Sequence, residues 1–167
     1  VAGATIVNTL TLNDGSGSTG GILRNQNVST TFNNGFITAG VANDATADTL
    51  YVWNGANTMT MGSIIKNNGA DPLAVVFTGN GSGSASTGVL ALNSANTFTG
   101  GLVINAGTVN LGSAGVASDG ATLGAGTVRN NGLLTINKTN IAHTIPNSIS
   151  GVGALTIARG TVTFTGA

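Results

Sequence analysis

Acidic side chains and a single histidine are the residues whose chemistry a reaction would use, and the chain has few of them. The chain has no glutamate and no cysteine. Its acidic residues are the aspartates Asp14, Asp44, Asp48, Asp71 and Asp119. A polysaccharide hydrolase or lyase needs paired carboxylates, often beside a basic residue or a metal ion. Asp44 and Asp48 are close in sequence, but the segment Ala42–Asp48 is typical of a loop with solvated charge. Such an enzyme would need Asp44, Asp48 or Asp119 to converge in a groove, and we expect no catalysis there.

The histidine, His143, lies in a run where strand alternation places it on the face of Ile141 and Ile145. A catalytic triad would need a serine and an aspartate beside it, and the Gly-Ser runs at 15–18 and 81–84 are typical of linkers. One histidine without cysteine does not suit a zinc site. We therefore predict a structural or surface role for His143, and no catalytic residue, cofactor or metal ligand in the chain.

Aromatic side chains are the other candidates for a site. Tyr51 and Trp53 alternate with Val52, so both rings lie on one face of a strand. If that face is outside, the rings could stack on a sugar or a protein partner. If it is inside, they belong to the core. We favour a core or partly covered position and keep Tyr51 and Trp53 as the candidate partner or glycan contact.

Composition sets the fold class that must position these residues. The chain has 167 residues, enough for one domain, and 41% of them are hydrophobic. Good helix formers are scarce, whereas Thr and Val are common, so we predict an all-β fold. The formal net charge is zero and there is no basic stripe, which argues against nucleic acid and an anionic membrane surface as partners. No apolar run approaches the roughly 20 residues that span a bilayer.

Short strands separated by turns fill the whole chain. The predicted strands are Ala4–Leu12, Gly21–Arg24, Thr30–Thr38, Thr49–Trp53, Thr58–Ile65, Leu73–Thr78, Val89–Asn93, Leu102–Asn105, Thr108–Leu111, Gly126–Arg129, Leu133–Asn137, Ile141–Ile145, Ala154–Ala158 and Thr161–Thr165. Asn-Gly turn signals lie between many of them, because Asn and Gly tolerate the left-handed conformation of tight corners. A sandwich of hairpins and a parallel β-helix both fit this spacing.

Internal similarity decides in favour of the β-helix. The segment 88–100 aligns with 153–166, which makes Leu90 and Leu92 equivalent to Leu155 and Ile157. The segment Asn54–Thr60 also recurs 39 residues later as Asn93–Thr99. We predict one parallel β-helix (β-solenoid) domain over residues 1–167, with about seven coils of roughly 20–25 residues. Asparagines at its corners are expected to form hydrogen-bonded ladders between coils.

Two solenoid functions need a residue repeated in every coil. Calcium-binding solenoids carry an aspartate in each repeat, whereas the run Asp14–Ser18 occurs once. Ice binding needs stacked Thr-x-Thr pairs at constant spacing. The pairs that begin at residues 9, 58, 97 and 161 are 49, 39 and 64 residues apart, so the ladder is incomplete.

The run Asn96–Gly112 resembles the autotransporter-associated β-strand repeat of bacterial passenger domains. That repeat has Asn-Thr-aromatic-Thr-Gly-Gly, an apolar strand, Asn-Ala-Gly-Thr and a strand that ends in Gly. The match is close over 89–112 and weaker near Asn8, Asn57 and Thr161. The resemblance implies a right-handed, single-stranded β-helix on the exterior of a Gram-negative-type cell. It does not imply one activity, since such passengers include adhesins, toxins, proteases and matrix-like proteins.

The expected function is therefore a non-enzymatic structural or adhesive module, extracellular or on the bacterial outer surface. Autotransporters carry a C-terminal outer-membrane barrel that these residues do not include, so we expect a fragment or repeat unit of a longer surface protein. Open coil ends and few repelling charges predict self-association end to end into filaments or matrix. Host-cell, matrix or glycan surfaces are further expected partners, without membrane insertion by this segment. The alternatives are a polysaccharide-acting hydrolase or lyase and an ice-binding solenoid.

Overall fold

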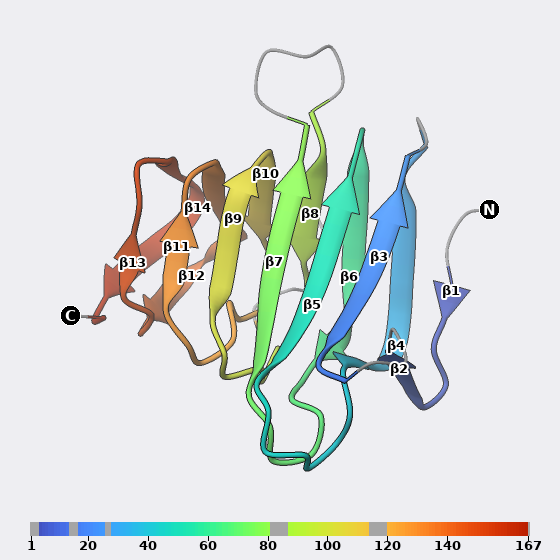
Figure 1. Cartoon of the computed structure of the whole chain (residues 1–167). Helices are drawn as coiled ribbons and strands as arrows, with labels where there is room; N and C mark the ends of the chain where they lie inside the picture. The colour runs from blue at the N-terminus through green and yellow to red at the C-terminus, as the bar shows by residue number, and fades with distance from the viewer. Residues whose placement is uncertain (1–3, 14–16, 26–27, 81–86, 114–119, 167) are drawn as a thin grey trace.

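The chain folds into a parallel β-solenoid with two facing sheets (Figure 1). The computed structural model describes residues 4–13, 17–25, 28–80, 87–113 and 120–166. No helix occurs in these residues, and every pairing between named strands is parallel. The predicted all-β parallel architecture is confirmed.

The chain passes from one sheet to the other and back, adding a strand to each. Sheet A contains β1 (Ala4–Thr5), β2 (Thr9–Leu12), β4 (Thr30–Ala39), β6 (Thr58–Ile65), β8 (Val89–Leu92), β10 (Thr108–Leu111), β12 (Leu133–Ile145) and β14 (Ala154–Phe164). Sheet B contains β3 (Thr19–Arg24), β5 (Asp48–Asn54), β7 (Leu73–Gly79), β9 (Leu102–Ala106), β11 (Val128–Asn130) and β13 (Ile149–Ser150). In Figure 1 the strands of sheet B point upward in front while the chain advances from right to left, which makes the coil right-handed.

The core lies between the sheets and is built from columns of apolar side chains, one per coil. In β6 and β7 every second residue is buried, because successive side chains of a strand point to opposite faces. One column of paired positions contains Met59, Leu90, Val109, Leu134 and Leu155. A second column, two residues further along each strand, contains Leu92 and Ile157. The predicted equivalences of Leu90 with Leu155 and of Leu92 with Ile157 are therefore confirmed. Burying each such side chain stabilises the fold by about 1.5–3 kcal/mol.

Coil length varies more than the sequence predicts. Successive members of the Met59 column lie between 19 and 31 residues apart. The shortest step, from Leu90 to Val109, passes a tight corner at Gly107, whereas the longest includes the segment between β7 and β8. The number of about seven coils stays a prediction.

The corner at Gly107 is closed to any side chain. Gly107 has a left-handed φ of 81°, and a Cβ there would lie 2.7 Å from the Cα of Gly79 and 2.7 Å from the carbonyl oxygen of Gly88. The next coil stacks directly on this corner, since the Leu133 N–H donates to the Gly107 carbonyl at 2.9 Å. Glycine is required here by both the conformation and the close approach of neighbouring coils.

Buried asparagines connect the coils at their bends by bonds to backbone groups, whereas the predicted ladders of stacked asparagines are not found among the described residues. Asn96 accepts from the Ile65 N–H at 2.9 Å and donates to the Thr122 carbonyl at 2.9 Å, which joins it to the coils on both sides. Asn147 donates to the carbonyls of Gly124 and Gly126. These amides satisfy backbone groups that the strands leave unpaired, because buried polar groups require partners.

Some predicted elements are wrong. The strand predicted over Ala4–Leu12 is broken at Ile6–Asn8, and the two strands predicted between 133 and 145 form one β12 with an irregular register. The two predicted between 154 and 165 likewise form one β14, and β13 was not predicted.

The 39-residue recurrence also does not mark equivalent positions. Thr58 pairs with Val89 at the start of β6, whereas Thr97 lies outside any strand, after β8. Asn54–Thr60 leads from β5 into β6, whereas Asn93–Thr99 follows β8 and leads toward β9, so the recurring segments lie at different bends of the coil.

Candidate functional site

Asp48 is buried, which contradicts the prediction of a solvated loop. It is the first residue of β5, has 0% exposure, and its N–H donates to the Pro72 carbonyl at 2.9 Å. Neither carboxylate oxygen has a hydrogen-bond partner among the described residues. Burial raises the pKa of the Asp48 carboxyl, and the nearby charges of Asp44 and Asp71 raise it further.

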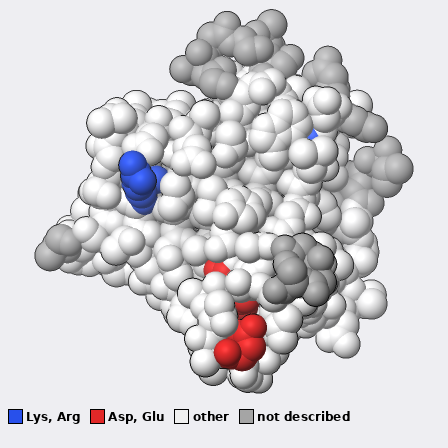
Figure 2. Space-filling view, in the orientation of Figure 1, with Lys and Arg blue, Asp and Glu red and all other residues white. Residues whose placement is uncertain are grey.

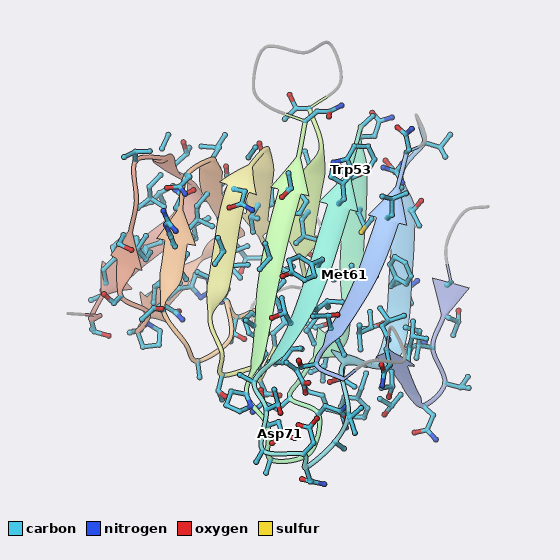
Figure 3. The ribbon with its side chains drawn as sticks, viewed as in Figure 1. Trp53, Met61 and Asp71 are labelled. Carbon is cyan, nitrogen blue, oxygen red and sulfur yellow. The ribbon has the colours of Figure 1, made fainter. Side chains whose placement is uncertain are left out.

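Asp44 and Asp71 stabilise two stacked loops below the sheets. The Asp44 N–H donates to Asp71 Oδ2 at 3.0 Å, and the Thr46 N–H donates to Asp44 Oδ1 at 2.8 Å. Figure 2 shows the acidic atoms gathered at this lower lobe, and Figure 3 places Asp71 there. The described aspartates do not form a metal-binding group of three. The carboxylates of Asp44 and Asp71 accept from backbone N–H groups of the loops, whereas the Asp48 carboxylate makes no hydrogen bond among the described residues.

The remaining predicted acids, Asp14 and Asp119, lie outside the described residues, as does most of the candidate calcium run Asp14–Ser18. His143 is in β12, opposite Val162 of β14, and shares the inner face with Ile145. Its predicted place on the face of Ile145 is confirmed, whereas the side chain of Ile141 lies outside the described part of the chain. The side chain of His143 is almost wholly buried, and its Nε2 has no partner among the described residues.

The threonine pairs do not build a regular array. The outward column of sheet A that contains Thr60 continues through Ala91 and Asn110 before it returns to Thr135. A flat row of threonines that could bind ice is therefore interrupted at Ala91 and Asn110.

Tyr51 and Trp53 lie on the outer face of sheet B, so the predicted core position is wrong, whereas the alternative of a partly covered position holds for Trp53. In β5 the inner positions are Leu50 and Val52, which are fully buried, whereas Tyr51 is 51% exposed and Trp53 is partly exposed. Figure 3 shows Trp53 near the upper end of β5. The rings remain together on one face, as predicted.

Small and apolar neighbours on β3 and β7 complete a surface that we call the aromatic face. Its outward residues are Gly21, Leu23, Tyr51, Trp53, Val76 and Thr78. In one row Tyr51 has Gly21 and Val76 as its neighbours. In the next row Trp53 lies between Leu23, which is 77% exposed, and Thr78.

The aromatic face is hollowed because Gly21 has no side chain next to the Tyr51 ring. The hollow has a volume of about 400 Å³. A second hollow of about 330 Å³ shares Gly21 and Tyr51 and is also lined by Asn13 and Thr19. Sequence reasoning missed Gly21 and Leu23, although two consecutive glycines inside a predicted strand are a sign of a hollow or a close approach.

The position of the indole depends on a second glycine. A Cβ at Gly55 would lie 2.7 Å from a ring carbon of Trp53, so the ring occupies the space above this corner. Beneath the corner, Arg24 is buried and donates to Asn54 Oδ1 at 2.6 Å. This buried arginine, whose pKa is lowered by desolvation, was not predicted and has a structural place at the bend.

The last coil exposes the apolar residues that continue the core. Leu155 and Ile157 are 44% and 48% exposed, whereas Leu134 and Ile136, their partners in the preceding coil, are fully buried. β14 and β13 are also the edge strands of their sheets among the described residues. Unpaired strand edges and half-exposed core side chains together form the surface that we call the open end.

Comparison of the chain with protein-family models, with curated proteins and with solved structures gives no match. Within the described residues, no helix has the length and apolar character that crossing a membrane requires.

Proposed function

We propose that this chain is a non-enzymatic structural or adhesive solenoid module, secreted or carried on a bacterial outer surface, whose open end joins further coils. The observation that carries the proposal is the exposure of Leu155 and Ile157 in register with the fully buried Leu134 and Ile136. A parallel strand placed on β14 would bury these side chains and satisfy the unpaired edge. That strand would come from more of the same chain or from a second copy.

The scarcity of charge at both ends supports the proposal. Between Ile149 and Gly166 the only charged side chain is Arg159, and between Ala4 and Asn13 there is none. Charges on edge strands are a common way in which proteins oppose edge-to-edge association. Without them, electrostatic repulsion does not keep the two ends of neighbouring copies apart.

The surface location is proposed from the repeat resemblance of Asn96–Gly112. In the fold, its Asn-Ala-Gly run forms the corner between β9 and β10. Strand β10 pairs with β8 and β12, the strands of the coils on both sides. An autotransporter-like passenger of this kind would be a rod that acts through its faces and ends.

Sedimentation velocity over a concentration series tests association through the open end. We expect the wild-type chain to form larger species as concentration rises, and a variant with Leu155→Thr and Ile157→Thr to remain monomeric. Thr156→Ser, at the intervening outward position, is the matched control and should associate like the wild type. A wild-type monomer at every concentration, or equal association by the double variant, would exclude self-association through this surface.

A further inference from the structure

We propose that the aromatic face binds a neutral oligosaccharide, with Tyr51 and Trp53 as the stacking surfaces. The site lies on the side of the solenoid and not at its end. The proposal names the ligand of an adhesive module, but it holds whether or not the open ends associate, so the two proposals fail separately.

The shape of the face fits a sugar ring. The C–H faces of a pyranose are apolar and pack on aromatic rings, while its hydroxyl groups need polar partners around the edge. Tyr51 and Trp53 supply the rings, and the missing side chain at Gly21 leaves room beside them. A hollow of about 400 Å³ falls within the range of roughly 300–1,000 Å³ that is usual for small ligands.

Hydroxyl and amide groups border the rings on both sides. Thr78 lines the first hollow, and Asn105 donates to its Oγ1 at 3.3 Å from the neighbouring strand. Asn13 and Thr19 line the second hollow, which adjoins the first at Tyr51. A linear oligosaccharide that crosses β3 and β5 would therefore place one sugar in each hollow, with Tyr51 between the two sugars.

The electrostatics of the face favour a ligand without charge. None of the outward residues of the aromatic face (Gly21, Leu23, Tyr51, Trp53, Val76 and Thr78) carries a charge. Along the row of Tyr51, the first ionisable side chain after Val76 and Val103 is Arg129, on β11. An acidic glycan would find no counter-charge on the aromatic face, whereas a neutral one needs none.

A sugar also fits the face better than a protein partner does. A stable protein interface buries about 800 Å² on each side and is anchored by side chains that fill pockets of the partner. Here the rings stand beside shallow hollows, and the row beyond Val103 becomes polar at Arg129 and Ser150. The small, hollowed and uncharged surface matches one short carbohydrate segment.

Tryptophan fluorescence tests the proposal directly, because Trp53 is the only tryptophan in the chain. The probes are cellohexaose, laminarihexaose and mannohexaose, with hexagalacturonate as the acidic comparison. We expect a saturable change in Trp53 emission with at least one neutral hexasaccharide at concentrations up to about 10 mM, and none with hexagalacturonate. No saturable change with any neutral probe, or tighter binding of hexagalacturonate, would overturn the proposal.

Two variants test whether oligosaccharide binding depends on the aromatic face and not on the rest of sheet B. Gly21→Val fills the hollow without backbone strain, since among the described residues the nearest atom to its Cβ position is the Tyr51 carbonyl oxygen at 3.7 Å. Tyr51→Ala removes one ring. Each should weaken binding about tenfold, while Val103→Ala, in the same row on β9, should bind like the wild type. Thermal unfolding confirms that the variants fold, and unchanged affinity in both Gly21→Val and Tyr51→Ala would contradict the assignment.

Discussion

At the scale of single residues, Asp48 couples the stability of the solenoid to pH. Its carboxylate is buried without a hydrogen-bond partner among the described residues, and burial raises its pKa above the ordinary value of 3.8. The folded chain therefore holds this proton more tightly than the unfolded chain does. The stabilisation is fully present below pH 3.8 and is lost as pH rises through the raised folded pKa.

Asp48→Asn should remove this loss. We expect the variant to be more stable than the wild type by about 1 kcal/mol at pH 7, with little difference at pH 3. Chemical denaturation at a series of pH values measures both free energies of unfolding. Asp44→Asn removes one of the charges that raise the pKa of Asp48, so it should give a smaller effect of the same sign. A variant at position 48 that is less stable at pH 7 would show that the carboxylate has a favourable partner.

Gly107 is a second residue on which the fold depends. Gly107→Ala should destabilise the chain by about 2 kcal/mol, because its φ is left-handed and the added Cβ meets the neighbouring coil. Gly120→Ala is the matched control, since no atom of the described residues lies within 4 Å of its Cβ position, and it should change stability by less than about 0.5 kcal/mol. Equal midpoints of urea denaturation for the two variants would contradict the stacked corner.

Residue types alone could not place Tyr51 and Trp53. Both alternating sets of β5 are largely apolar, so the pattern shows that the rings share a face but not that this face is outside. The burial of Asp48 could have been predicted from strand alternation, because residue 48 is an even number of positions from the core residues Leu50 and Val52 and therefore points to the same face. The prediction of a solvated loop relied on the charge of Asp48 and not on its place in the alternation of β5, and it was wrong for this reason.

At the scale of elements, the coils are joined by buried amides as well as by strand pairing. Asn96→Ala leaves the buried Ile65 N–H without its acceptor and removes the bond to Thr122. We expect a loss of about 2 kcal/mol in the free energy of unfolding. Asn105→Ala is the control, since Asn105 is exposed and its bond to Thr78 is long, and it should change little. Similar stability of the two variants by urea denaturation would contradict the role of Asn96.

Strand positions were predictable where alternation is clean and turns are clear. The bounds of β6 and β10 were predicted without error, because a glycine or asparagine turn closes each of them. β12 and β14 were each divided in the prediction, since polar or small residues interrupt the alternation; the pairing of the two strands is itself irregular at this place, with a register shift between Asn137 and Ala142. β13 has only two residues, too few for any pattern.

At the scale of the whole molecule, the solenoid is a short rod with a polarity. Its N-terminal end presents β1, β2 and β3, and its C-terminal end presents β14 and β13, all in parallel sheets (Figure 1). Contacts between unlike ends do not close on themselves and generate open filaments. Internal repeats predicted this stacked architecture, but the exposure of Leu155 and Ile157 required the register between coils.

Electron microscopy of the purified chain over a concentration series, with fibre diffraction of any filaments, tests the central claim most directly. End-to-end stacking predicts filaments of constant width, with strands perpendicular to the filament axis and a spacing of about 4.8 Å along it. The variant with Leu155→Thr and Ile157→Thr should form none. Short separate rods at every concentration, or filaments whose strands run along the axis, would contradict the account.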